Sequence, residues 1–232
     1  MNRIELSRAA IERAAKRRGR PYVFETIDPA RTALVVIDLQ NFFMEPGQAV
    51  EVPAARGIVP NVNRLARACR AAGATVIWVQ MTQNPGELDN WSVFYRHVLT
   101  KEQANNEIAR LSPGDHGHAL WPGLDVEPGD LKVPKKRFSA FIQGSSNLEQ
   151  IVRAKGIDTL IITGTTTTTC CQTTALDAMQ LNFKIVFMAD ATAAPNDEAH
   201  NAVLSNILNV FGDVRMTDDV VALLESSTVR AA

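Results

Sequence analysis

The sequence has almost no net charge, few cysteines and no long apolar run, and each shortage excludes a class of protein. The 24 Lys and Arg residues nearly balance the 25 Asp and Glu residues, so no global field attracts nucleic acid or an anionic membrane. Three cysteines are too few for a disulfide framework, which favours free thiols in a reducing compartment. No apolar run approaches the roughly 20 residues that a membrane helix needs. We therefore expect a cytoplasmic protein that binds neither nucleic acid nor membrane.

The first 20 residues carry charges throughout and end in the basic run Lys16–Arg20. A secretory signal needs an apolar core, which this stretch lacks. Its two acidic residues and single serine also argue against a transit peptide. We predict that residues 1–30 form a solvated helical arm, which packs on a sister subunit, and that residues 31–232 form a single domain.

Short apolar runs rich in β-branched residues alternate with helical patterns along the chain, as in βαβ units. The runs that predict strands are 33–37, 75–80, 131–133, 159–163, 184–189 and 214–216. Residues 82–129 are irregular, and we expect them to form an insertion over one sheet end, with a helix near 91–110. The pattern predicts an α/β fold of three layers, Rossmann-like, with a six-stranded, mostly parallel sheet between helices.

Three reactive side chains follow predicted strands. Asp38 ends the first strand, Lys135 the third, and Cys170 follows the fourth after a polar loop. Open parallel sheets bind ligands outside the carboxyl ends of their strands. We therefore expect these three residues to lie at the rim where a ligand would bind.

Cys170 stands where the polar loop Gly164–Thr169 leads into a predicted helix. The free N–H groups of a helix N-terminus stabilise a thiolate, lower the pKa of the thiol and bind a developing oxyanion. This pattern predicts a nucleophile. The alternative is that Cys170 is a small packing residue.

Asp38 and Lys135 each have a catalytic and a structural interpretation. A carboxylate at the mouth of an apolar crevice has its pKa raised by loss of water, as a general base requires. A cation between a carboxylate and a thiol would hold both groups in their anionic forms. The alternatives are a capping role for Asp38 and a solvated surface position for Lys135.

Taken together, the three stretches resemble the isochorismatase-like cysteine hydrolase superfamily, from about Thr32 to Met216. The matching motifs are Asp38-Leu39-Gln40, Lys135-Lys136-Arg137-Phe138-Ser139-Ala140-Phe141, and the stretch Gly164–Ala178. The register of these motifs selects Lys135 over Lys136, and Cys170 over Cys171. Three motifs in the family's order form a specific signal, whereas any one alone would be weak.

The resemblance implies an isochorismatase-type fold with an Asp-Lys-Cys triad. Asp38 would take the thiol proton and later activate water, Lys135 would hold the carboxylate and the sulfur, and Cys170 would attack a carbonyl carbon. It also implies a non-proline cis peptide between Thr165 and Thr166. The backbone N–H groups of Thr166 and Cys170 would then form the oxyanion hole.

Within the superfamily the chain looks closest to N-carbamoylsarcosine amidases and ureidoacrylate amidohydrolases. This placement implies hydrolysis of a C–N bond in a small linear amide, above all a carbamoyl or ureido compound. A nicotinamidase-like activity and an isochorismatase-type reaction are the alternatives within the family. Outside it, a redox protein could use the adjacent thiols Cys170 and Cys171, although neighbouring helical residues point about 100° apart.

The zinc ligands of the family's nicotinamidases are missing after the second strand. Residues 81–86 contain no histidine, and the next one along the chain is His97. His116 and His118 have a chelating spacing but no third ligand nearby in the sequence, which favours a solvated loop. We therefore expect neither a metal nor a cofactor.

Four residues are expected to contact the substrate. Phe43 matches an aromatic residue that lines the pocket in this family, and Asn84, Trp91 and Tyr95 lie in the insertion that should close the crevice. Thr168 stands where the family commonly has asparagine. The resemblance also implies a homodimer or homotetramer.

Overall fold

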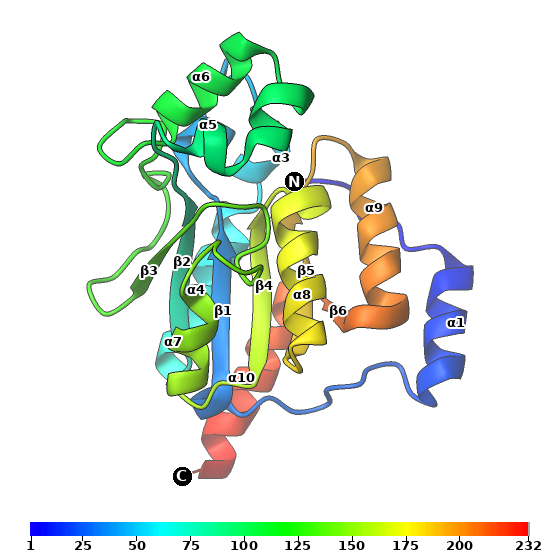
Figure 1. Cartoon of the computed structure of the whole chain (residues 1–232). Coiled ribbons are helices and arrows are strands. Elements are labelled where there is room, and N and C mark those ends of the chain that lie inside the picture. Colours follow the sequence, from blue (N-terminus) through cyan, green and yellow to red (C-terminus); the bar gives the residue numbers. More distant parts are fainter. Residues whose placement is uncertain (232) are drawn as a thin grey trace.

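A computed structural model describes the backbone of residues 1–231 and the side chains of residues 1–227. Its sheet has the strand order β3-β2-β1-β4-β5-β6, and every neighbouring pair is parallel (Figure 1). The strands are β1 (Thr32–Ile37), β2 (Thr75–Met81), β3 (Leu131–Lys135), β4 (Thr159–Thr165), β5 (Lys184–Ala193) and β6 (Asp213–Arg215). The predicted six-stranded parallel sheet is confirmed.

Helices cover both faces of the sheet, as the three-layer prediction requires (Figure 1). The α-helices are α1 (Arg8–Arg18), α2 (Asn41–Met44), α3 (Pro53–Arg56), α4 (Val59–Ala72), α5 (Glu87–Asn90), α6 (Lys101–Arg110), α7 (Leu148–Ala154), α8 (Gln172–Gln180), α9 (Asp197–Asn206) and α10 (Thr217–Ala231). The described residues also form short helical turns of other types. The π-helical turns are η2 (Phe94–Val98), η3 (Thr167–Cys171) and η4 (Ile207–Phe211), and the 3₁₀ turn is η1 (Pro29–Arg31).

The central strand β1 shows why its sequence is continuously apolar. Val35 and Ile37 pack into one core cluster with residues of α7, α8 and α9. Leu34 and Val36 point the other way, into a second cluster with residues of α4 and α10. Successive side chains of a strand alternate between the two faces, so a strand covered on both sides has no position left for polar residues.

Helix α4 follows the spacing that the sequence predicts. Val62, Leu65, Ala66 and Cys69 are buried against the sheet. Gly73 ends the helix with φ +83°, a left-handed conformation that glycine adopts without steric cost. The helix therefore connects β1 to β2 as a right-handed crossover of the usual length.

The insertion between β2 and β3, residues 82–130, lies over the carboxyl ends of the neighbouring strands (Figure 1) and is called the cap below. We expected one helix near 91–110, but the cap has the turn η2 and then α6. Thr100 breaks the run, because its side chain accepts the Gln103 N–H while the Gln103 side chain accepts the Thr100 N–H. This capping box starts a new helix at Lys101.

The N-terminal arm contains the helix α1, which packs on its own chain, and packing of the arm on a sister subunit stays a prediction. Ala10 and Ala14 of α1 are buried, and α1 packs against η4. Arg18 forms an ion pair with Asp213 of β6 at 3.1 Å. No helix among the described residues is long and apolar enough to span a membrane. The division into an arm (1–30) and one domain (31–232) stays a prediction.

Candidate active site

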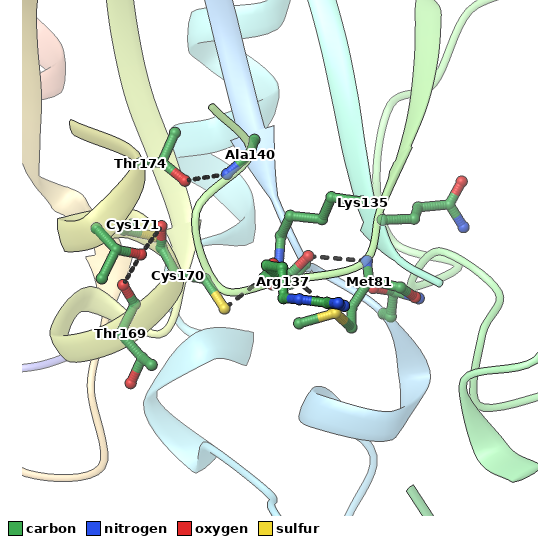
Figure 2. A network of polar contacts seen from close by, with 12 residues as sticks. Met81, Lys135, Arg137, Ala140, Thr169, Cys170, Cys171 and Thr174 are labelled. Carbon is green, nitrogen blue, oxygen red and sulfur yellow. Dashed lines mark hydrogen bonds and ion pairs between the residues drawn. The ribbon is translucent and has the colours of Figure 1, made fainter. Parts of the chain in front are cut away.

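Asp38, Lys135 and Cys170 meet at the carboxyl ends of the central strands. Lys135 Nζ lies 2.8 Å from Asp38 Oδ2. It also lies 3.4 Å from Cys170 Sγ, and Figure 2 labels Lys135 and Cys170. The lysine starts from β3, two strands away from β1, so its long side chain crosses β2 beside Met81 to reach the other two groups. The sheet topology therefore brings together residues that are almost 100 positions apart.

Asp38 has a backbone conformation that is rare outside glycine, with φ +53°. Aspartate is among the few other residues that tolerate the left-handed region. Its N–H donates to the Val79 carbonyl at 2.9 Å, and its Oδ1 accepts the Met81 N–H at 3.0 Å. The backbone outlier at the end of β1 thus turns the carboxylate toward Lys135, where β2 holds it in place.

Lys135 is fully buried, and its ammonium group forms an ion pair with Asp38 and hydrogen bonds to other groups of the site. Besides Asp38 and Cys170, Nζ donates to the Arg137 carbonyl oxygen at 3.1 Å. Burial lowers the pKa of the amine, but the Asp38 charge, together with the contact to Cys170, outweighs it and raises the pKa above its usual value. Lys135 is therefore a buried ammonium ion with charged and polar partners, the arrangement in which a buried charge is tolerated.

The pKa of the Cys170 thiol is raised, contrary to the lowering that we expected at a helix N-terminus. Burial, followed by the nearby Asp38 charge, raises the pKa of Cys170 despite the opposing effect of Lys135. The π-helical turn η3 runs directly into α8, so Cys170 lies in the first turn of this helical segment, and burial is nevertheless the largest influence on its pKa. The pKa of Asp38, as predicted, is raised by burial, against the lowering effects of Lys135, Cys170 and the Met81 N–H.

The loop before Cys170 needs the glycine with which it starts. Gly164 has φ +114°, and a Cβ atom there would lie 2.0 Å from the carbonyl oxygen of Ile37 on the paired strand β1. The next peptide bond, Thr165–Thr166, is cis, as the resemblance implied. The Thr166 carbonyl oxygen then accepts the N–H groups of Thr169 and Cys171, both at 3.1 Å. These bonds shape the turn that presents Cys170.

The comparisons agree with this geometry. The family profile described as the Isochorismatase domain matches residues 32–219. This chain belongs to the isochorismatase family. The relatives described next support an amidohydrolase of that family, a hydrolase that acts on amide C–N bonds.

Several relatives show where the chain stands within the isochorismatase family. It is 36% identical to a probable inactive nicotinamidase of Arabidopsis thaliana over 77% of this chain and 89% of that protein. It is 32% identical to the ureidoacrylate amidohydrolase RutB of Methylobacterium radiotolerans over 80% and 76% of the two chains.

Solved structures share the same fold. A cysteine hydrolase from Pseudomonas syringae pv. phaseolicola matches with a TM-score of 0.76 and 28% identity, covering 90% of this chain and 99% of that one. An N-carbamoylsarcosine amidase from Thermoplasma acidophilum matches with a TM-score of 0.64 and 27% identity, covering 81% and 97%. The predicted resemblance to the isochorismatase-like cysteine hydrolases is confirmed.

Gln40 supports the site of this isochorismatase-family enzyme, a role that we did not predict. Its buried amide contacts both polar atoms of the Met81 backbone, since Oε1 accepts the N–H at 2.8 Å and Nε2 donates to the carbonyl oxygen at 3.0 Å. Nε2 also donates to the His118 carbonyl oxygen at 2.9 Å. The Met81 N–H is shared with Asp38, so Gln40 holds the group that orients the carboxylate. The sequence signal that could have indicated this role was the position of Gln40 as the third residue of the motif Asp38-Leu39-Gln40.

The cap is attached to the site by a buried ion-pair cluster that the sequence analysis also missed. Glu87 is 1% exposed and lies 3.1 Å from Lys136 Nζ and 3.2 Å from Arg137 Nη1. Burial raises the pKa of Glu87, but the two cations more than offset this and lower it overall. Arg137 Nη2 also donates to the Asn90 carbonyl oxygen at 2.8 Å. The residue whose carbonyl oxygen binds Lys135 thus also binds α5 of the cap.

The loop after Lys135 is tied to the helix after Cys170 as well. The Ala140 N–H donates to Thr174 Oγ1 at 3.1 Å (Figure 2). Thr174 lies on α8, one turn beyond Cys170. This hydrogen bond therefore links the loop that follows the lysine to the helix that follows the sulfur.

Two of the four predicted substrate contacts lie in aromatic packing near the site. Phe43 is half-buried, packs against both core clusters and contacts Phe42 edge-on. Trp91 is half-buried in the cap, with its ring 4.8 Å from that of Phe138 and 5.0 Å from the Arg137 guanidinium. Trp91 thus packs against the loop that follows Lys135.

The other two predicted contacts are engaged within the cap. Asn84 is exposed, and its Oδ1 accepts the Gly86 N–H of its own turn at 3.1 Å. Tyr95 is 2% exposed and donates its hydroxyl to Glu107 at 3.1 Å, within a small core formed with Ala104 and other cap residues. Neither side chain has a contact with the triad, and their roles toward substrate stay predictions.

The two histidines with chelating spacing have other partners. His116 Nε2 lies 3.1 Å from Glu45, and His118 Nε2 lies 2.9 Å from the Thr82 hydroxyl. Among the described side chains, no group of three or more His, Cys, Asp or Glu residues has the arrangement of a metal site.

Proposed function

We propose that this protein is a cysteine amidohydrolase that cleaves the C–N bond of a small linear amide with a carbamoyl or ureido group. The observation that carries the proposal is the contact of one ammonium group with both a buried carboxylate and a buried thiol. The similarity to a ureidoacrylate amidohydrolase and to an N-carbamoylsarcosine amidase supports the substrate class.

The first step is the attack of the sulfur on the carbonyl carbon. Asp38 accepts the thiol proton, which its raised pKa makes favourable, and Lys135 stays charged between the two groups. The forming carbon–sulfur bond pushes the carbonyl electron pair onto oxygen. We assign the backbone N–H groups of Thr166 and Cys170 to this oxyanion.

The second step expels the amine and then hydrolyses the thioester-type intermediate. Asp38 returns its proton to the leaving nitrogen as the C–N bond breaks. The Asp38 carboxylate then accepts a proton from water, whose oxygen attacks the carbonyl carbon and displaces the sulfur. Proton transfer back to the sulfur restores the resting thiol, so the carboxyl group acts alternately as base and acid.

A redox function fits the structure less well. Cys171 is fully buried, and its sulfur lies 3.7 Å from the Thr163 carbonyl oxygen, on the β4 side of the turn. Cys170 Sγ contacts Lys135 instead. The two sulfurs therefore have separate partners, which favours nucleophilic chemistry at Cys170.

Mass spectrometry of the protein after incubation with candidate substrates tests the proposal. The panel contains ureido acids, N-carbamoyl amino acids, biuret-like compounds and nicotinamide. We expect a carbamoyl-type adduct on Cys170 and release of ammonia, both absent from Cys170→Ser and retained in Cys171→Ser. An adduct on Cys171, or turnover by Cys170→Ser, would contradict the assignment, and turnover of nicotinamide alone would replace the substrate class.

A further inference from the structure

A buried histidine lies directly behind the turn that presents Cys170. His200, on α9, is fully buried, as is Thr167, the first residue of η3. The His200 Nδ1 atom lies 3.0 Å from the Thr167 hydroxyl, and its Nε2 lies 3.0 Å from the Ala189 carbonyl oxygen. The mechanism above uses neither side chain.

The contacts of the ring determine which nitrogen carries the proton. A carbonyl oxygen only accepts hydrogen bonds, so Nε2 must carry a hydrogen toward Ala189. Burial lowers the pKa of His200, and the Met1 amino group acts in the same direction. The Ala189 carbonyl oxygen and the Asp197 carboxylate oppose this lowering but do not cancel it. In a neutral ring with its hydrogen on Nε2, Nδ1 is an acceptor. The Thr167 hydroxyl therefore donates to His200.

This hydrogen bond holds a residue that adjoins the predicted oxyanion hole. Thr167 follows Thr166, whose carbonyl oxygen accepts the N–H groups of Thr169 and Cys171. Thr165, on the other side, donates its hydroxyl to the Ala193 carbonyl oxygen at 3.4 Å. Side chains on both sides of Thr166 thus attach the turn to β5 and to α9.

The helix that carries His200 is itself held at its first turn. The Asn196 side chain caps α9 by accepting the Ala199 N–H at 2.9 Å. Asn2 accepts the Ala194 N–H at 2.9 Å and donates to Asp197 Oδ1 at 3.0 Å. The N-terminal segment therefore anchors the end of β5 to α9, and His200 is a rigid support for the turn.

We propose that His200 is a positioning residue for the hydrolysis, in its neutral form with the proton on Nε2. It orients Thr167 and, through it, the N–H groups of Thr166 and Cys170 that receive the oxyanion. This inference rests on the proposed function, because an oxyanion hole has a role only if Cys170 attacks a carbonyl group. Oxyanion donors act through their geometry, and a displacement of about 1 Å can cost a hundredfold in rate.

A measurement without substrate tests the ring. ¹⁵N NMR of the imidazole groups at pH 7 resolves four histidines, and the His200 signals are those missing from His200→Gln. We expect a neutral ring with its hydrogen on Nε2, and a shift of the Nδ1 resonance in Thr167→Val, where the donor is lost. A charged ring, a hydrogen on Nδ1, or an unchanged Nδ1 resonance in Thr167→Val would overturn the proposal.

Kinetics with the compound that acylates Cys170 test the positioning role. We expect His200→Ala and Thr167→Val each to lower kcat by about 10-fold to 100-fold with little change in KM, because the lost interaction acts on the transition state. The double variant should fall no further than the single ones, since both remove the same hydrogen bond. His200→Gln, which keeps a donor and an acceptor, should recover part of the rate. The exposed His97→Ala is the matched control.

The two tests separate this inference from the proposed function. If the losses in kcat multiply in the double variant, or if His200→Gln recovers none of the rate, His200 is a packing residue and not a positioning residue. If the native protein forms no adduct on Cys170, the proposed function fails, while the NMR experiment still decides the state of the ring. If His200→Ala does not fold, Thr167→Val, which keeps the side-chain volume, provides the kinetic comparison.

Discussion

The two walls of the site, the strand ends below and the cap above, are built in different ways. Below, parallel pairing of β1 with β2 and β4 sets the positions of Asp38 and the turn before Cys170 through the backbone. Above, the cap is attached to the loop after β3 largely by side chains, with Glu87 bound by Lys136 and Arg137. The reactive groups are thus positioned by the sheet. Residues 117–121 of the cap are bound to the segment that follows β1 by backbone hydrogen bonds, whereas the α5 part of the cap depends on a few side-chain contacts.

This difference separates catalysis from substrate selection. A change of register in the sheet would disrupt every neighbouring strand, so the position of the triad is as stable as the fold. The cap can be loosened by one substitution without a change in the sheet. We therefore expect substitutions below to abolish the reaction, and substitutions in the cap to alter the affinity for substrate.

The largest effect is expected for Lys135→Met. The substitution leaves the buried Asp38 and Cys170 without their shared cation, so the carboxylate no longer has support as a base. We expect turnover to fall at least about 1000-fold. Lys132→Met, on the same strand but exposed, is the matched control and should keep native rates. A Lys135→Met enzyme within tenfold of the native rate would show that the lower wall does not require its cation.

The lower wall was predictable because its signals are local and its geometry follows from a general rule. Asp38, Lys135 and the Gly164–Thr169 loop each come at a strand end, and parallel strands bring their carboxyl ends to one edge. The thiol pKa was not predictable, because the burial of Cys170 outweighs any effect of a nearby helix end and depends on the packed structure.

The cap and the support behind Cys170 were harder to predict, for two different reasons. Thr100 and Gln103 are a capping box that was present in the sequence, but the apolar pattern on either side concealed it. Glu87 and His200 gave no local signal. The cations that bind Glu87 are 49 or more positions away along the chain, and the groups that contact the His200 ring are 11 or more positions away. Such pairings arise from tertiary packing, which hydrophobic periodicity does not encode.

A medium effect, confined to the cap, is expected for Glu87→Gln. The variant leaves Lys136 and Arg137 without their carboxylate, and we expect a loss of about 1–3 kcal/mol in the local stability of the cap, since both cations are partly exposed. Hydrogen exchange should accelerate in residues 84–111 but not in the strands, and KM should rise more than kcat falls. The exposed Glu102→Gln is the control. Faster exchange in β1 and β4 would show that the two walls unfold together.

The smallest effect concerns pH and compares the half-buried His118 of the cap with the buried His200 below it. Burial lowers the pKa of His118 in the cap and of His200 below it, so each takes up a proton more readily in the unfolded chain. Stability therefore falls as the pH drops below about 6.5, by up to about 1.4 kcal/mol per pH unit for each histidine, until the lowered folded pKa is reached.

The test is to measure the unfolding free energy in urea between pH 5 and 7 for the native protein, His118→Gln and His200→Gln. The comparison isolates the contributions of the two histidines from those of the carboxyl groups. His200→Gln should have a flatter pH dependence of the global unfolding free energy than the native protein. If the cap opens before the sheet unfolds, only His200→Gln flattens the global transition, and the effect of His118→Gln appears in the hydrogen exchange of the cap. Equal flattening of the global transition by both variants would show that cap and sheet form one cooperative unit, and would contradict the independence argued above.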